Sequence, residues 1–313
     1  MRSEYTHQPV LLEEVTDLLV GKLDGIYVDG TVGNGGHSQA IGEKITSEGR
    51  LICLDMDSEA VRISKERLSS LSKKLSLFKA NYVELAEILK RLGIEKVDGI
   101  FLDLGLSSHQ LEHSGRGFSF SRDEPLDMRM DSHNEFTAHE AINTFPSNHL
   151  VRILQEYGEE KWAKRIVKII EEERKRKPIK SSLELANLVK KAIPVSHHPK
   201  AKHPATKTFQ ALRIAVNREL ENLRTFFDMA PFLVNKGGRI AVLSYHSLED
   251  RMVKQTMLDW ERECTCPPDL PKCVCEKVSL FERLNKRGIR PKAQEIQMNP
   301  RARSATLRGA ERV

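Results

Sequence analysis

A glycine-rich stretch near the start of the chain has the residue types of a cofactor-binding loop. Residues 26–37 read Ile-Tyr-Val-Asp-Gly-Thr-Val-Gly-Asn-Gly-Gly-His. The apolar start predicts a short buried strand, the glycines predict a turn, and the residues from Ser38 to Ile45 predict a helix. Glycine adopts positive φ and lets a ligand approach the backbone, while the start of a helix points free N–H groups outward. A tight turn without any ligand is the alternative.

Three glycine-rich patterns compete for this stretch. A phosphate-binding P-loop ends in Gly-Lys-Ser/Thr, whereas this loop ends in Gly-Gly-His. A dinucleotide fingerprint that begins at Gly33 requires glycine where the chain has Ser38, so a nicotinamide dehydrogenase is a weaker alternative. The pattern Asp-Gly-x-x-Gly-x-Gly-Gly of S-adenosylmethionine-dependent methyltransferases fits residues 29–36. In that pattern an acidic residue ends the first strand, and the glycines approach the amino-acid end of the cofactor.

A second acidic residue follows the next predicted strand. Residues 50–57 read Arg-Leu-Ile-Cys-Leu-Asp-Met-Asp, in which Asp55 ends a buried strand. A carboxylate at this place can accept hydrogen bonds from ribose hydroxyls, which supports a nucleoside ligand without naming it. Asp57 or Ser58 is expected to cap the helix Glu59–Leu71, which leaves Asp55 free for the ligand.

Later strands are predicted to bring more polar residues to the same edge, because ligands lie beyond the carboxyl ends of parallel strands. The strand Leu75–Lys79 precedes Tyr82, whose ring either stacks on an adenine or simply packs. The strand 97–105 places Asp103 and Ser107 at the reaction centre. The strand 238–244 delivers Tyr245 and His246 to this edge.

The rest of the chain is predicted to be mainly helical. A helix over 7–22 leans on the sheet, and no strand is expected between Leu106 and His203. The predicted helices after strand four are Ser147–Glu156, Glu159–Arg176, Ser181–Ala192 and one long helix from Lys207 to Leu233. A last edge strand is predicted at Ser304–Arg308.

Charge is unevenly distributed along the chain. Residues 1–150 hold 16 basic against 24 acidic side chains, whereas 151–220 hold 17 against 8 and 277–313 hold 10 against 3. An acidic body with two basic blocks is a plausible footprint for RNA, although lysine-rich helix surfaces are also common. No run of 18 apolar residues and no apolar signal core are present, so we expect a cytoplasmic protein without a membrane span or disulfides.

These stretches together resemble one family, the bacterial ribosomal RNA small-subunit methyltransferase H, also called MraW. The matching stretches cover the whole chain: 29–37, 103–108, 116–120, 125–131, 157–160, 203–210, 244–251 and 299–304. The resemblance implies an α/β fold with a class I, Rossmann-like S-adenosylmethionine-dependent methyltransferase sheet and an inserted all-helical domain. The expected division is 1–106 for the first part of the methyltransferase domain, 107–206 for the helical substrate-recognition domain, and 207–313 for the second part with a basic tail.

The resemblance also implies an activity, N4-methylation of a cytidine in the decoding region of 16S rRNA, with the small ribosomal subunit as partner. The sequence does not distinguish a monomer from a homodimer. Many relatives have Phe where this chain has Tyr82, and either ring can pack on adenine. The cofactor contacts implied by the family, together with the loop glycine, are Gly33, Gly35, Gly36, His37, Asp55, Tyr82, Asp103 and Gln110.

The chemistry of this reaction can be argued from the residues. The exocyclic amine of cytosine is a poor nucleophile, because its lone pair is delocalised into the ring. A hydrogen-bond acceptor on the amine N–H helps to localise that pair and later takes the proton. We predict Asp103, Ser107 and His246 as the catalytic residues, with Asp103 mainly holding cofactor and the other two handling the amine. A nonenzymatic RNA-binding or assembly factor that keeps the fold is the alternative.

A cysteine array stands apart from this core. Two Cys-x-Cys pairs, separated by six residues, supply four thiols: Cys264, Cys266, Cys273 and Cys275. Four thiolates can close a tetrahedral zinc site, although the usual pairs have two intervening residues. A structural zinc is therefore one prediction, and free thiols or a redox pair are the other. Cys53 lies within a predicted strand and is expected in the core.

Overall fold

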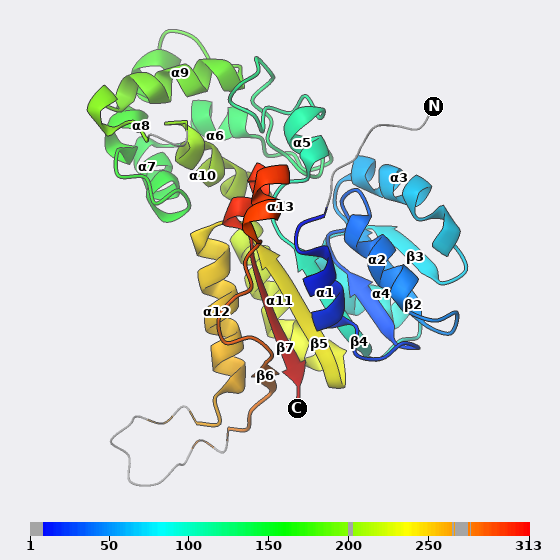
Figure 1. Cartoon of the computed structure of the whole chain (residues 1–313). Helices are drawn as coiled ribbons and strands as arrows, with labels where there is room; N and C mark the ends of the chain where they lie inside the picture. The colour runs from blue at the N-terminus through cyan, green and yellow to red at the C-terminus, as the bar shows by residue number, and fades with distance from the viewer. Residues whose placement is uncertain (1–8, 200–202, 265, 267–274, 276) are drawn as a thin grey trace. The chain divides into compact units, whose positions relative to one another are not determined.

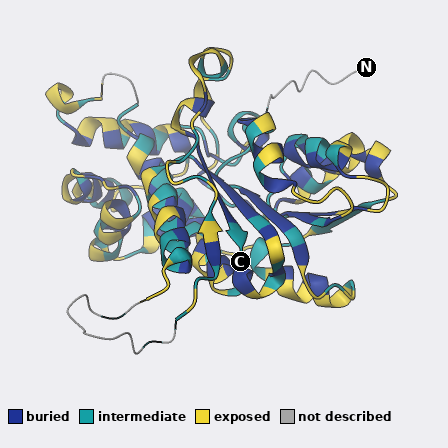
Figure 2. Ribbon diagram, turned by 60° about the horizontal axis from the view of Figure 1, so that its bottom comes forward, coloured by how far each residue is buried: buried dark blue, intermediate teal, exposed yellow. Residues whose placement is uncertain are grey.

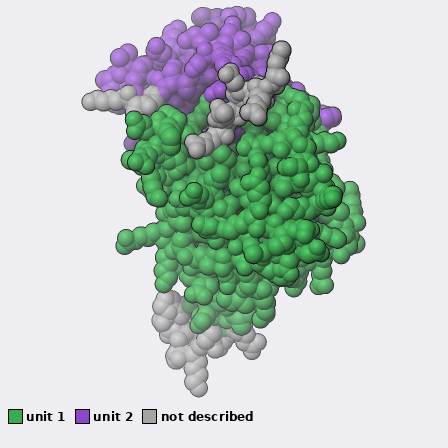
Figure 3. Space-filling model, turned by 45° about the vertical axis from the view of Figure 1, so that its right-hand side comes forward, with its two compact units in different colours: residues 1–105, 222–313 green, residues 106–221 purple. Residues whose placement is uncertain are grey.

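A computed structural model of the chain describes residues 9–199, 203–264, 266, 275 and 277–313 (Figure 1). The chain forms two compact units, which Figure 3 colours separately. Unit 1 consists of Met1–Gly105 and Asn222–Val313, and unit 2 consists of Leu106–Glu221. Unit 2 is thus an insertion, because the chain leaves unit 1 after β4 and returns to it within α11.

Unit 1 is built on a seven-stranded sheet with the order β3-β2-β1-β4-β5-β7-β6. The strands are β1 (Ile26–Asp29), β2 (Arg50–Asp55), β3 (Leu75–Lys79), β4 (Val97–Asp103), β5 (Val234–Ser244), β6 (Phe281–Arg283) and β7 (Thr306–Arg312). Strands β1 to β5 pair in parallel, and β7 is antiparallel to both of its neighbours. This α/β sheet is the Rossmann-like arrangement that the sequence predicted. The carboxyl ends of β1, β2 and β4 consequently lie at one edge.

Both faces of the sheet are covered, which is why its strands read as continuous apolar runs. Alternate residues of one strand enter different cores: Val28 of β1 packs with α4, α11 and α12, whereas its neighbour Tyr27 packs with α1 and α2. The buried interior of each layer is dark blue in Figure 2. The helices with residues in unit 1 are α1 (Leu12–Leu19), α2 (Gly36–Lys44), α3 (Ser58–Arg67), α4 (Leu85–Arg91), α11 (Glu219–Leu233), α12 (Ser247–Glu261) and α13 (Ala293–Met298).

Unit 2 has helices and, among its described residues, no strand between β4 and β5, as predicted. Its helices are α5 (Ser108–Glu112), α6 (Ala138–Thr144), α7 (Ser147–Glu156), α8 (Ala163–Arg174), α9 (Ser182–Ala192) and α10 (Thr206–Asn217). Side chains such as Leu154, Ile166 and Leu185 are fully buried between them, which gives this unit a core of its own.

One predicted helix is in fact two. The sequence predicts a single helix from Lys207 to Leu233, whereas α10 ends at Asn217 and α11 begins at Glu219. The residue between them, Arg218, has a φ of 52°, which ends a helix as the left-handed residue of a cap. This break carries no glycine, so the apolar pattern of the sequence runs across it without a signal.

The last strand is also different from its prediction. It spans Thr306–Arg312 rather than Ser304–Arg308, and it is not an edge strand, because β6 pairs with its outer side. Strand β6 has only three residues, too few for an alternating pattern to be recognised in the sequence. In the described residues no helix is long and apolar enough to cross a membrane.

Candidate active site

The loop between β1 and α2 requires its glycines for geometric reasons. Gly33 and Gly35 have φ values of 51° and 77°, which side chains with a Cβ rarely adopt. A Cβ at Gly36 would collide with the ring of Pro9, so the first turn of α2 lies directly against the chain segment at Pro9, before α1. The predicted sequence of strand, turn and helix is therefore present, with α2 beginning at Gly36 rather than Ser38.

The acidic residue that ends β1 stabilises this loop from inside. The buried carboxylate of Asp29 accepts hydrogen bonds from the hydroxyl of Ser38 at 2.5 Å and from the N–H of Thr31 at 3.1 Å. Burial raises the pKa of Asp29 to about 6, against the lowering effect of the Ser38 hydrogen bond. Ser38, which broke the dinucleotide pattern, is thus a structural partner of Asp29. Cys53 is buried beside it, as predicted.

One polar atom of the loop has no partner among the described residues. The side-chain oxygen of Asn34 is buried, yet no hydrogen bond reaches it. A buried amide oxygen without a partner costs free energy, so such an atom commonly marks a place where a ligand or water donates. Asn34 was not among the predicted site residues, although its position between Gly33 and Gly35 was a signal in the sequence.

Asp55 lies at the tip of β2 and faces the same loop. Its carboxylate accepts from the N–H of Gly33 and from the N–H of Asp57, each at 2.9 Å. Asp57 caps α3 by accepting from the N–H of Glu59 at 3.1 Å, which confirms the predicted cap and leaves Asp55 half-buried at the surface of the site. Burial raises the pKa of Asp55 to about 7.

Asp103, at the end of β4, is held by residues from two other strand ends. The hydroxyl of Tyr245 donates to its Oδ1 at 2.9 Å, and His37 Nδ1 lies 3.4 Å from its Oδ2. Its backbone N–H donates to the hydroxyl of Thr31 at 2.6 Å. The segments that follow β1, β4 and β5 were predicted to share one edge of the sheet, and side chains from all three meet at this carboxylate. Thr31 was missed, because a hydroxyl that serves a backbone N–H across the sheet leaves no pattern in sequence.

The imidazole of His37 has acceptors at both nitrogens. Nε2 lies 2.9 Å from the carbonyl oxygen of Val10, and Nδ1 faces Asp103. Only the doubly protonated ring can donate to both. Burial by itself lowers the pKa of His37, but the hydrogen bond to Asp103 and its negative charge outweigh that effect, so the net shift is upward.

Tyr82 packs within unit 1. Its ring meets Phe226 edge-on with centroids 5.8 Å apart, and it remains half-buried. The packing alternative is therefore present, and contact with an adenine stays a prediction.

His246 begins α12 and has a capping role. Its Nδ1 accepts from the N–H of Glu249 at 3.3 Å, so the neutral ring carries its proton on Nε2. Nε2 is buried 3.0 Å from Glu249 Oε1, although the angle is not that of a hydrogen bond. The other oxygen of Glu249 accepts from the N–H of Tyr245 at 2.9 Å. Glu249 was missed because the cap before it is a histidine, whereas a capping box is recognised in sequence by Ser or Thr at the cap.

Ser107 and Gln110 belong to unit 2, where they form a capping box for α5. The hydroxyl of Ser107 accepts from the N–H of Gln110 at 3.1 Å, and the side-chain oxygen of Gln110 accepts from the N–H of Ser107 at 3.0 Å. Their predicted roles toward substrate and cofactor stay predictions.

Comparison with known proteins assigns the chain to a family. The family model described as the MraW methylase family matches residues 4–313. The chain belongs to the MraW methylase family. Its sheet is therefore the predicted class I, Rossmann-like methyltransferase sheet.

Two relatives show how closely the whole length agrees. The protein named "Ribosomal RNA small subunit methyltransferase H" of Halothermothrix orenii is 46% identical over 307 residues, 98% of each chain. The protein of the same name in Clostridioides difficile is 44% identical over 310 residues, 99% of this chain and all of its own. A solved rRNA methylase from Streptococcus thermophilus is a more distant match: it covers 96% of this chain and 93% of its own at 11% identity, with a TM-score of 0.42.

The Asp103 cluster of this MraW-family chain can be tested by removing one hydroxyl. Tyr245→Phe keeps the ring but leaves Asp103 Oδ1 without its 2.9 Å donor. Burial and the charge of Asp103 keep the pKa of Tyr245 far above its ordinary value, so the phenol is a permanent donor at neutral pH. Because a hydrogen bond to a charged group contributes about 1.5–3 kcal/mol, we expect the free energy of unfolding in urea to fall by about that amount. An unchanged free energy would mean that water replaces the hydroxyl.

Proposed function

We propose that this protein transfers a methyl group from S-adenosylmethionine to N4 of a cytidine in the decoding region of 16S rRNA. Membership of the methylase family carries the proposal, and the relatives named as small-subunit rRNA methyltransferases support its substrate class. The residues of the sheet edge are compatible with this activity in cofactor binding, proton handling and charge. Bacterial rRNA lies in the cytoplasm, where this activity belongs.

The β1–α2 loop and the tip of β2 fit the proposed cofactor. The loop holds two positive-φ glycines and the unpartnered oxygen of Asn34, which can accept from an amino group. Asp55 offers a half-buried carboxylate for ribose hydroxyls, and Tyr82, which follows β3 and is half-buried, would flank the base. S-adenosylmethionine supplies a methyl group activated by a sulfonium, so the remaining requirement is position rather than further activation.

Asp103 is the best-positioned group for the charged end of the cofactor or for the amine. His37 and Tyr245 fix the two carboxylate oxygens, so the group does not need to reorganise when a ligand arrives. About a quarter of its side chain remains exposed, whereas His37 is buried. The carboxylate can therefore meet a ligand while its imidazole partner stays shielded from water.

The two basic blocks support an RNA partner. The first block, 151–220, includes the basic run 174–177. Two lysines of this run form ion pairs within unit 2, Lys175 with Glu171 and Lys177 with Glu184. The block at 277–313 carries ten basic side chains against three acidic ones. A target base must be single-stranded or swung out of its stack, and phosphate contacts from basic side chains hold the flanking nucleotides.

The direct test is a nucleoside analysis of small-subunit rRNA. Cells that lack the protein should lose N4-methylation of one cytidine, and the purified protein should restore it from labelled S-adenosylmethionine on small-subunit particles from those cells. The nonenzymatic alternative predicts that particles bind the protein but gain no label. Label at another atom or another nucleotide would reject the proposed product while keeping the methyltransferase.

Cofactor binding should depend on pH through Asp55. With a pKa of about 7, the free carboxyl is largely protonated at pH 6 and then accepts ribose hydrogen bonds poorly. We expect the Kd for S-adenosylhomocysteine, measured by calorimetry, to be about tenfold larger at pH 6 than at pH 8. Asp55→Asn should bind more weakly at pH 8 and lose most of this dependence. An equal pH dependence in Asp55→Asn would assign it to another group, such as His37.

The proposed amine-handling roles of His246 and Ser107 require variants that keep their helix caps. Asn is as good a cap as Ser, so His246→Asn and Ser107→Asn retain α12 and α5 while removing the imidazole and the hydroxyl. If these groups handle the amine, single-turnover methyl transfer should slow by at least about tenfold, with cofactor affinity unchanged. Wild-type rates in both variants would show that the two residues act only as helix caps.

A further inference from the structure

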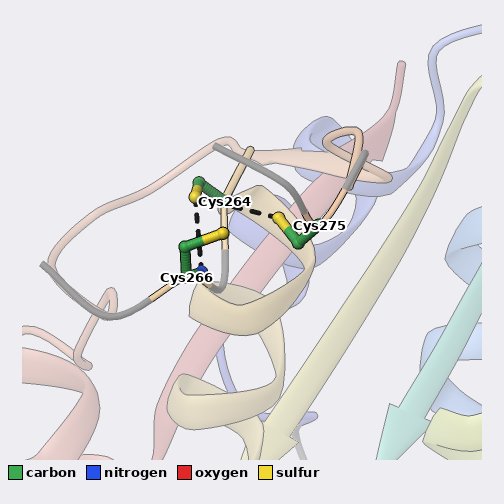
Figure 4. Close-up of side chains that lie close together, drawn as sticks. All are labelled: Cys264, Cys266 and Cys275. Atoms are coloured by element: carbon green, nitrogen blue, oxygen red, sulfur yellow. Dashed lines mark hydrogen bonds between the residues drawn. The ribbon is translucent and has the colours of Figure 1, made fainter. Parts of the chain in front are cut away.

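Three of the five cysteines lie close together at the end of α12, outside the methyltransferase site (Figure 4). Cys264 and Cys266 follow the helix by a few residues, and Cys275 lies beside Cys264 although it comes eleven residues later in the chain. Their sulfur atoms all lie within 4.8 Å of one another. The fourth cysteine of the array, Cys273, lies outside the described residues, so the cluster considered consists of the three described thiols.

The spacing of the sulfur atoms matches a metal site better than a disulfide. Cys264 and Cys275 have their sulfur atoms 3.8 Å apart. Four thiolates at a Zn–S distance of about 2.3 Å define a tetrahedron whose edges are about 3.8 Å. A disulfide requires the two sulfur atoms to be about 2 Å apart. The sulfur atoms of Cys264 and Cys275 therefore already have the separation that a bound zinc ion would impose, and all three sulfur atoms lie within 4.8 Å of one another.

The backbone near Cys264 also suits a thiolate. The N–H of Cys266 donates to the sulfur of Cys264 at 3.3 Å, as the dashed line in Figure 4 shows. A hydrogen bond of this kind fixes the orientation of a ligand sulfur. Thiolates are soft ligands, and a set of sulfur atoms in tetrahedral array selects zinc among the common divalent ions.

The neighbouring contacts indicate what such a site would do. The carbonyl of Trp260, near the end of α12, accepts from the N–H of Leu280 at 2.8 Å, and the rings of Trp260 and Phe281 stack at 4.6 Å. Glu261 pairs with Arg283 of β6 at 2.6 Å. The cysteines thus lie where the chain leaves α12 and returns to β6. A metal ion bound by these cysteines would link the end of α12 to the residues that lead into β6.

We propose that Cys264, Cys266 and Cys275 bind a structural zinc ion that fastens the end of α12 to the start of β6. The zinc takes no part in methyl transfer. Its binding releases the thiol protons, and its loss loosens β6 rather than the β1–α2 loop. Free thiols and a redox-active disulfide are the competing states of the same cysteines.

Metal analysis of the full chain tests this proposal. Wild-type protein purified without chelator should contain about one zinc per chain, and Cys264→Ser and Cys275→Ser should each contain less than about 0.1. Cys53→Ala is the matched control: it also removes one cysteine, but from the buried core of β2, and should retain the zinc. Less than about 0.1 zinc in the wild type, or equal zinc in the Ser variants, would overturn the proposal, as would iron or copper in its place.

A second measurement uses only the wild-type protein, so it tests the site even if the cysteine variants do not fold. Wild-type protein stripped of metal by a chelator should regain one zinc on titration with zinc chloride, with a return of the original free energy of unfolding. Cobalt(II) should replace the zinc and give the visible absorption of tetrahedral thiolate coordination. Failure to regain metal, or a mass two units lower from a disulfide, would reject the site. The Kd for S-adenosylhomocysteine should not change, so this result is independent of the proposed methyl transfer.

Discussion

The carboxylate of Asp103 is the point on which the site depends. It joins three strand ends that are far apart in the sequence, because His37 follows β1, Asp103 ends β4 and Tyr245 follows β5. Each partner depends on the carboxylate: its hydrogen bond and charge raise the pKa of His37, and the hydroxyl of Tyr245 has it as an acceptor. A parallel sheet brings such ends together by topology alone, and the hydrogen bonds then set their distances.

The loop around this carboxylate combines rigid and unsatisfied parts. Asp29 and Ser38 fix the loop from the buried side, and the glycines allow the backbone to turn without a Cβ in the way. The side-chain oxygen of Asn34 has no hydrogen-bond partner among the described residues, and Asp55 stays half-buried while it accepts from the backbone of the loop. A site that is structured before its ligand arrives loses less conformational entropy on binding. The same residues that maintain the fold thus prepare the binding surface.

Much of this arrangement was predictable because it rests on local rules. The strand, turn and helix over 26–45, the Asp57 cap and the strand that carries Asp103 all follow from apolar runs, glycines and capping residues, although that last strand was predicted to run on to Gly105. The pairing of Asp103 with His37 and Tyr245 was not predictable, since it depends on side-chain directions across three strands. The break at Arg218 was missed because a left-handed residue without glycine leaves no signal. Helix α6 was missed despite its capping box at Thr137, which the sequence does contain.

The insertion of unit 2 has a consequence for how the chain folds. Strand β4 ends at Asp103 and its partner β5 begins at Val234, so their pairing must close a loop of about 130 residues, whose entropic cost grows only with the logarithm of its length. The long separation lowers the folding rate more than it lowers the stability of the fold, because pairings between distant segments form slowly. An insert with its own buried core can collapse first and shorten the search. The helical unit would then act during folding as an internal assembly aid for the sheet that surrounds it in the sequence.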